Sequence, residues 1–397
     1  MKESVEVADI FRLFGEAYRQ VYGANMPLRQ LRAMRAIEIC RTAVLGGHVD
    51  ECDVCGAVRI SYNSCRNRHC PKCQCLAKEQ WIEAQKQDLL DVPYFHVVFT
   101  LPEELRPLAR CNQKVVYNLL FKAASQTLLT LAEDPKHLGA QTGFTAILHT
   151  WTQTLAYHPH LHLIVTGGGL SKDGTQWVAK RKGFFIPVKV LSALFKGKFL
   201  AYLKAAYEKG DLTFQGRIAP LGNPVSFKGL LARVYQKGWM VYCKPPFGNP
   251  EKVLEYLGRY THRVAISNER IENLKGDQIT FRYRDSTDGD KTKRMILSAF
   301  RFIQRFLQHI LPDRFVKIRH YGILSNRNRK TRLFQARQIL GARCDGAHQE
   351  KPIWQDLLYR LTGIDPRTCP LCKKGQMVTK EILLPHSNRS PPERISS

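Results

Sequence analysis

Hydrophobic and polar positions follow two different patterns along the chain, and the change falls near residue 93. Before it, apolar side chains recur at helical spacing and predict helices over residues 10–22, 28–43 and 77–90. After it, short apolar runs predict strands that are separated by helices. Strands and helices that mix without strict βαβ alternation indicate an α+β fold with a largely antiparallel central sheet flanked by helices. The predicted strands are 95–100, 143–150, 161–166, 177–179, 239–244, 264–267 and 279–283, and the helices between them are 114–131, 190–209, 250–261 and 298–309.

These patterns divide the chain into three segments. Residues 1–92 predict a helical module with a cysteine-rich, zinc-ribbon-like insert. Residues 93–325 carry the α+β domain. Residues 326–397 form a basic segment with a second Cys-x-x-Cys, and its polar, Pro-containing end is expected to be partly disordered.

The charge of the chain calls for a polyanionic partner. The 397 residues contain 61 Lys and Arg against 34 Asp and Glu, a net charge of +27, on a composition that is 44% hydrophobic and therefore globular. Nucleic acid is the first candidate, because neutralising its phosphates releases counterions. An anionic membrane surface is the rival, but no stretch approaches the roughly 18 apolar residues of a spanning helix. The first residues lack a signal-peptide core, which favours the cytoplasm near the nucleoid.

Two cysteine pairs near the amino terminus have the spacing of metal ligands. Cys52-x-x-Cys55 and Cys70-x-x-Cys73 together predict a four-thiolate zinc site, which is structural because it leaves no open position. Arg66 and Arg68 lie in the same insert and are expected to contact DNA. Other donors crowd this segment, and we expect spare or structural roles for them rather than a second site: His48, Cys65, His69 and Cys75.

A further set of donors lies near the carboxyl terminus. Cys344 and His348 precede Cys369-x-x-Cys372 by about twenty residues, a spacing acceptable for a second zinc site. The alternative, that these four side chains bind no metal, stays open. Cys40, Cys111 and Cys243 stand apart from the clusters, and small buried core residues are the default expectation for them.

The segment His158-Pro-His160-Leu-His162 leads into an apolar strand. Residues i and i+2 of a strand point to one face, so His160 and His162 present two imidazoles side by side. Burying both without a compensating ion would be costly, which favours a divalent cation. His149, near the end of the preceding strand, is the first choice for a third ligand, with Gln153 and then His158 as alternatives.

A third motif carries two tyrosines. Tyr256 and Tyr260 lie at i and i+4 of a predicted helix and so share one face. Such a pair alone indicates core packing, but Arg259 and Arg263 beside it create an electropositive environment that could hold a phosphate of DNA. The functional interpretation of this helix therefore depends on the histidines.

These motifs together resemble one family. His160-Leu-His162 resembles the HUH signature of rolling-circle nucleases, and Tyr256-x-x-x-Tyr260 resembles the paired motif of their two-tyrosine class. Four sequence segments, in this order, are similar to segments of the IS91 family of rolling-circle insertion-sequence transposases: YNSCRNRHCPKCQ, HTWTQTLAYHPHLH, YLGRYTHRVAISN and RHYGIL. The likeness extends from about residue 28 to 325, and the carboxyl-terminal fifth departs from it.

The resemblance implies a mechanism. The histidines would bind Mg²⁺ or Mn²⁺ and the tyrosines would act as nucleophiles on single-stranded DNA at the ends of a mobile element, through a 5′-phosphotyrosine. The spacing of His149 from His160 resembles the three-histidine arrangement of relaxases. A plasmid replication initiator or relaxase would share this chemistry. A non-catalytic zinc-ribbon DNA-binding protein is the other alternative, and it would leave the histidines and tyrosines unexplained.

Overall fold

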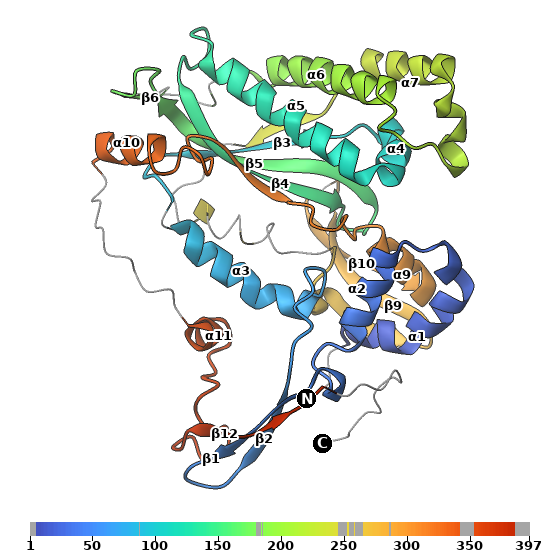
Figure 1. Ribbon diagram of the computed structural model, residues 1–397, viewed down its shortest axis with the longest axis vertical. Helices are drawn as coiled ribbons and strands as arrows, with labels where there is room; N and C mark the ends of the chain where they lie inside the picture. Colours follow the sequence, from blue (N-terminus) through green and yellow to red (C-terminus); the bar gives the residue numbers. More distant parts are fainter. Residues whose placement is uncertain are drawn as a thin grey trace.

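An antiparallel six-stranded sheet forms the centre of the molecule (Figure 1). The computed structural model describes residues 5–86, 88–179, 184, 186–244, 252–253, 258, 265–285, 287–341 and 353–385. The strand order is β11-β4-β5-β3-β7, with β6 paired to β5. The strands are β3 (Tyr94–Thr100), β4 (Gln141–Trp151), β5 (Tyr157–Leu170), β6 (Trp177–Ala179), β7 (Val241–Lys244) and β11 (Ile318–Gly322).

One face of this sheet is covered by helices. Leu161, Leu163 and Val165 of β5 point into the largest hydrophobic core of the protein, whereas the alternate residues of the strand point the other way. Figure 1 shows the covering helices above the sheet. They are α4 (Arg106–Cys111), α5 (Gln113–Glu133), α6 (Val188–Glu208) and α7 (Pro224–Gln236).

The opposite face of the sheet is covered more sparsely. Helix α3 (Pro71–Lys86) lies beneath it in Figure 1. Trp81 and Ile82 of α3 pack with Ile147 and Ile164 of the sheet in a small separate core. This face carries the alternate residues of β4 and β5, which include the histidines.

A second sheet packs against the amino-terminal helices. Phe302 and Phe306 of α9 are fully buried in a core that also contains Phe11 and Met34. The first 40 residues and residues 265–310 therefore share one hydrophobic core. Its elements are α1 (Val7–Tyr22), α2 (Leu28–Glu38), β8 (Ile271–Lys275), β9 (Gln278–Asp285), β10 (Lys291–Ser298) and α9 (Ala299–Leu307).

A third sheet joins the two ends of the chain. β1 (Gly47–Cys52) and β2 (Val58–Tyr62) form a hairpin, and β12 (Met377–Leu383) pairs antiparallel with β1. Two helices, α10 (Arg332–Ile339) and α11 (Trp354–Thr362), lie between the central sheet and β12 along the chain (Figure 1). Residues 353–385 are therefore part of the ordered fold and extend the amino-terminal hairpin.

The predicted α+β class with an antiparallel sheet is confirmed, and the differences concern particular elements. The helix predicted over 28–43 ends at Glu38, and α3 begins at Pro71, earlier than predicted. The strand predicted over 264–267 is wrong for its described part, because Ala265 adopts a positive φ of 43° and residues 265–267 make no ladder. Most of the helix predicted over 250–261 lies outside the described residues. No described helix is long and apolar enough to cross a membrane.

Candidate functional site

Three histidines converge on the sparsely covered face of the central sheet. His160 and His162 lie on β5, and His149 on β4 is directly opposite His160 in the strand register. One ring nitrogen from each of the three lies within 4.8 Å of the other two, and all three side chains are buried. The structure thus brings together the three predicted ligands, which we call the histidine triad.

The other ring nitrogens of this group have partners of their own. Nδ1 of His160 lies 2.7 Å from the backbone carbonyl oxygen of His158. Nδ1 of His162 lies 2.8 Å from Nε2 of His96, a buried histidine on β3. The two Nε2 atoms of His160 and His162 face each other at 2.9 Å. These contacts orient both rings so that Nε2 is the nitrogen available to a cation.

Burial keeps these imidazoles in the form that binds metal. Desolvation lowers the pKa of His160 to about 4 and that of His162 well below its ordinary value. It also lowers the pKa of His96 to about 3. Neutral imidazole is the ligating form, so the donor set fits a divalent cation whose remaining positions water or phosphate oxygens would fill.

The two reserve ligands do not join the triad. Gln153 is exposed in the turn after β4. His158 is turned to Arg106, whose Nη2 lies 2.9 Å from its Nδ1. Among the described residues, the group of metal-ligating donors on this face consists of His149, His160 and His162.

The predicted nucleophiles Tyr256 and Tyr260 lie outside the described residues, as do Arg259 and Arg263. Two described residues flank Tyr256 in sequence. Val253 is 1% exposed and packs with Ile147 and Ile164 on the face that carries the histidine triad. Gly258 approaches α3 so closely that a Cβ there would lie 2.4 Å from Cδ1 of Ile82.

A first thiol cluster lies at the base of the β1–β2 hairpin. It consists of Cys40, Cys65, Cys70 and Cys73, whose sulfurs are separated by 3.6 to 3.7 Å where they are in contact. Four sulfurs at about 2.3 Å from a tetrahedral Zn²⁺ would be about 3.8 Å apart, whereas a disulfide needs about 2.05 Å. The geometry fits zinc and four free thiols.

A second thiol cluster lies at the tip of the same hairpin. It joins Cys52 and Cys55 to Cys369 and Cys372, with Cys52–Cys372 and Cys55–Cys369 sulfur distances of 3.7 Å. The backbone N–H of Gly375 donates to Sγ of Cys372 at 3.3 Å. A Cβ on Gly375 would lie 2.4 Å from Sγ of Cys52, so only glycine allows the two halves to approach this closely.

The structure therefore corrects the predicted pairing of cysteines. Cys52 and Cys55 do not meet Cys70 and Cys73, because β2 separates tip from base by about 17 Å, five residues at about 3.3 Å each. Cys369 and Cys372 pair with the hairpin tip, while their predicted partners Cys344 and His348 lie outside the described residues. Cys40 and Cys65 were not predicted as ligands. For Cys65, its position five residues before Cys70 was a signal in the sequence that it could share a metal site.

Two arginines of the cysteine-rich insert have different environments. Arg66 is exposed. Arg68 donates from Nη1 to the backbone carbonyl of Phe315 at 2.6 Å, and burial lowers its pKa. His69 accepts a hydrogen bond at Nε2 from the backbone N–H of Leu311. Arg68 and His69 thus hold the insert to residues 311–315, and Arg66 remains available to a partner.

Comparison of the sequence with known proteins identifies the class of the protein as a transposase. Residues 143–332 match a family model described as "Putative transposase", and residues 10–101 match one described as "Transposase zinc-binding domain". The chain thus belongs to the IS91 family of insertion-sequence transposases.

Two relatives illustrate this membership. The chain is 51% identical over 379 residues to "Putative transposase y4qJ" of Sinorhizobium fredii, covering 95% of each chain. It is 30% identical over 346 residues to "Transposase for insertion sequence element IS801" of Pseudomonas savastanoi pv. phaseolicola, covering 86% of this chain and 82% of the relative. No solved structure matches the chain. The protein is a DNA-processing enzyme, and its cysteine clusters support structural zinc.

Proposed function

We propose that this transposase cleaves and rejoins single-stranded DNA at the ends of its element by tyrosine transesterification. The observation that carries the proposal is the convergence of three buried imidazoles, with ring nitrogens within 4.8 Å of one another, on a sheet face. Val253, three residues before Tyr256, packs on the same face. Tyr256 and Tyr260 are therefore our candidates for the nucleophiles, with Arg259 and Arg263 as DNA-binding neighbours.

The histidine triad would hold Mg²⁺ or Mn²⁺, which when bound polarises a non-bridging oxygen of the scissile phosphate. His96 and the carbonyl of His158 orient two of the ligand rings. Burial lowers the pKa of His160 and of His162 and so keeps these two imidazoles neutral. These residues would position the phosphate in line with an attacking phenol.

The covalent step belongs to the tyrosines. The phenol of Tyr256 or Tyr260 loses its proton as its oxygen forms a bond to phosphorus, the bond from phosphorus to the 3′ oxygen breaks, and the departing 3′ oxygen takes up a proton. The products are a 5′-phosphotyrosine and a free 3′-hydroxyl. One phosphodiester replaces another, so the step is reversible and needs no nucleotide hydrolysis. Two tyrosines would let the enzyme hold one DNA end while it cuts a second.

We further propose that each thiol cluster holds one structural Zn²⁺. Four thiolates leave no open coordination position, which excludes a catalytic role for these ions. The first cluster would fix the cysteine-rich insert against the helical module, and the second would fix the carboxyl-terminal segment to the hairpin. The protein would then act on element ends in the nucleoid of the cytoplasm.

A replication initiator or relaxase would use the same chemistry on other DNA. The matches to transposases over 95% and 86% of the chain favour the transposase. A non-catalytic zinc-ribbon protein would have no use for a buried histidine triad.

Formation of a covalent adduct tests the proposed chemistry. Single-stranded oligonucleotides that carry the element end are incubated with the protein and Mn²⁺. A label at the 3′ end should migrate with the denatured protein, whereas a label at the 5′ end should leave on a fragment with a free 3′-hydroxyl. The reverse distribution would contradict a 5′-phosphotyrosine.

Variants identify the residues responsible. The double substitution Tyr256→Phe with Tyr260→Phe should abolish the adduct, and His160→Ala should reduce it at least about a hundredfold. Tyr359→Phe, an exposed tyrosine on α11, serves as the matched control and should leave it unchanged. An adduct that persists in the double variant would exclude these tyrosines as nucleophiles.

A further inference from the structure

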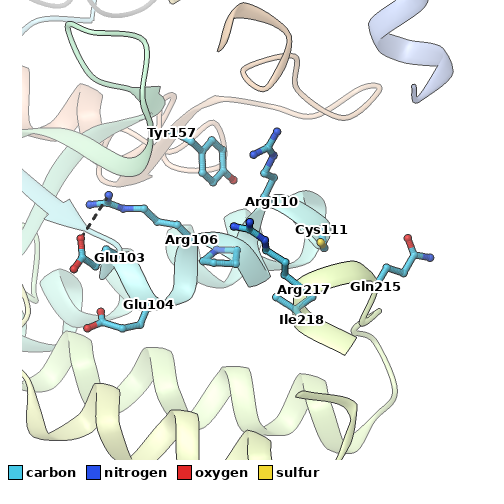
Figure 2. A pocket seen from close by; sticks show the side chains of 10 residues that line it. Glu103, Glu104, Arg106, Arg110, Cys111, Tyr157, Gln215, Arg217 and Ile218 are labelled. Carbon is cyan, nitrogen blue, oxygen red and sulfur yellow. Dashed lines mark ion pairs between the residues drawn. The ribbon is translucent and has the colours of Figure 1, made fainter. Parts of the chain in front are cut away.

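A pocket rich in arginine opens beside the start of β5. Figure 2 shows Arg106 and Arg110 from α4, Arg217 from the 3-10 helix Gly216–Gly222, and Tyr157 around its rim. Its volume is about 540 Å³. A smaller hollow adjoins it, shares Arg110 and Tyr157, and adds Arg301 and Arg305 from α9. Five guanidinium groups therefore follow one continuous surface.

Four of these five arginines have no acidic partner in the described part of the chain, and Arg106 alone lies near a described carboxylate. Arg110 and Arg217 are exposed, and no ion pair joins either of them to a described carboxylate. Of the two carboxylates at the rim, Glu104 pairs with Lys237 outside the pocket, and Glu103 lies 4.0 Å from Arg106 of the pocket itself. Like charges gathered in this way repel one another unless an anion lies between them.

The pocket is connected to the histidine triad by direct contacts. Nη2 of Arg106 lies 2.9 Å from Nδ1 of His158, and the backbone carbonyl of His158 is 2.7 Å from Nδ1 of His160. The rings of His158 and His160 are 5.1 Å apart between centroids. An anion in the pocket would therefore lie close to one bound at the triad.

The chemistry of the lining suits phosphodiesters in particular. A guanidinium is planar and always charged, and it binds phosphate through two parallel hydrogen bonds. The spacing of Arg106 and Arg110 at i and i+4 places both on one face of α4. The adjoining hollow continues the positive surface, so it accommodates a chain of phosphates better than one small anion.

We propose that this arginine pocket binds the backbone of the DNA strand that passes through the histidine triad. Arg110 and Arg217 contact phosphates of the strand beyond the scissile one, and Arg106 links their position to His158. The identity of the strand rests on the proposed function, since it is the strand that would be cut at the triad. Binding itself requires neither cleavage nor a divalent cation.

Fluorescence anisotropy with labelled single-stranded oligonucleotides tests the pocket, without divalent cations and across a series of salt concentrations. Arg110→Ala and Arg217→Ala should each weaken binding about tenfold, equally on unrelated sequences. Each should also reduce the slope of log affinity against log salt by about 0.7. Lys228→Ala, an exposed residue of α7 outside both hollows, removes the same charge and should change neither quantity.

The possible outcomes separate the sources of phosphate. An unchanged salt slope in the double variant Arg110→Ala with Arg217→Ala, or an equal loss in Lys228→Ala, would overturn the proposal. So would displacement of the labelled strand by inorganic phosphate, or by duplex DNA, as effective as that by unlabelled single strand at equal phosphate concentration. Arg110→Lys should recover part of the affinity, because it keeps the charge and loses the planar fork. Failure of adduct formation would not affect these results, because the tyrosines are intact and no metal is supplied.

Discussion

The two thiol clusters lie at opposite ends of one hairpin, and their surroundings differ. The first cluster, at the base, contains Cys40 and Cys70, which are 0% and 1% exposed and pack in the core formed by α1, α2 and α9. The second, at the tip, contains the exposed Cys55 and lies outside the hydrophobic cores of the described residues. At the base, a metal ion would add to the stability that a hydrophobic core already provides. At the tip, it would take the place of a hydrophobic core.

The difference also concerns sequence distance. The first cluster draws its ligands from residues 40–73, whereas Cys55 and Cys369 of the second are separated by 314 residues. Holding distant segments together by one ion makes their attachment depend on that ion, since few apolar contacts would remain without it. The base cluster should therefore contribute to global stability, and the tip cluster to the docking of residues 353–385.

Substitution of a buried ligand at the base should have the largest effect. Cys70→Ser should lower the free energy of unfolding by about 4 kcal/mol or more, because it removes a zinc ligand and leaves a hydroxyl among apolar side chains. Thermal or urea unfolding measures the change. Cys75→Ser is the matched control, since Cys75 is exposed two residues beyond the cluster, and it should alter stability by less than about 0.5 kcal/mol. Equal effects of the two substitutions would contradict a structural role for the base cluster.

The contrast between the clusters also explains what the sequence could and could not predict. Helices α1, α5 and α6 and strands β3 to β6 were predictable because their periodicity is strong and local. The triad was predictable for the same reason, since alternation along β5 places His160 and His162 on one face. The partner of a Cys-x-x-Cys is a property of tertiary structure, and spacing favoured the nearer pair. Strand β12 is mostly exposed, and its apolar residues stand in pairs at its two ends and do not alternate with polar ones, so no strand pattern reveals it.

Acid should weaken the core at the base independently of the metal. His309 is 1% exposed at the end of α9, and burial lowers its pKa to about 3. It bonds to Thr150 through Nδ1 and to the carbonyl of Leu155 through Nε2. Residues 353–385, which dock at the tip, contain no histidine. Protonation of buried histidine therefore distinguishes the two regions.

The sign of this pH effect follows from the depressed pKa. The unfolded chain binds a proton at His309 below about pH 6.5, while the folded protein does not until about pH 3, so stability is present above pH 6.5 and is lost as the pH falls. At pH 5 the loss from this residue should be about 2 kcal/mol. The difference in unfolding free energy between pH 7.5 and pH 5 should shrink by that amount in His309→Gln. A difference as large as in the wild type would show that His309 is protonated in the fold.

Substitution at the tip should have the smallest effect on global stability and the clearest effect on metal content. Cys369→Ser should change the free energy of unfolding by no more than about 1 kcal/mol, because residues 353–385 can detach locally. Mass spectrometry should nevertheless find one zinc ion per chain in place of the two that the clusters would hold. Rapid hydrogen exchange should appear in β12 and leave the central sheet protected.

Double substitutions decide which cysteines share an ion. Cys52→Ser combined with Cys369→Ser should lose no more zinc than either change alone, since both ligands belong to the tip cluster. Cys52→Ser combined with Cys70→Ser should lose both ions, because these cysteines belong to different clusters. If Cys52, Cys55, Cys70 and Cys73 shared one ion, this second combination would lose only that one, and Cys369→Ser alone would leave it bound. The pattern of losses therefore separates a hairpin closed on itself from one whose tip is closed by the far end of the chain.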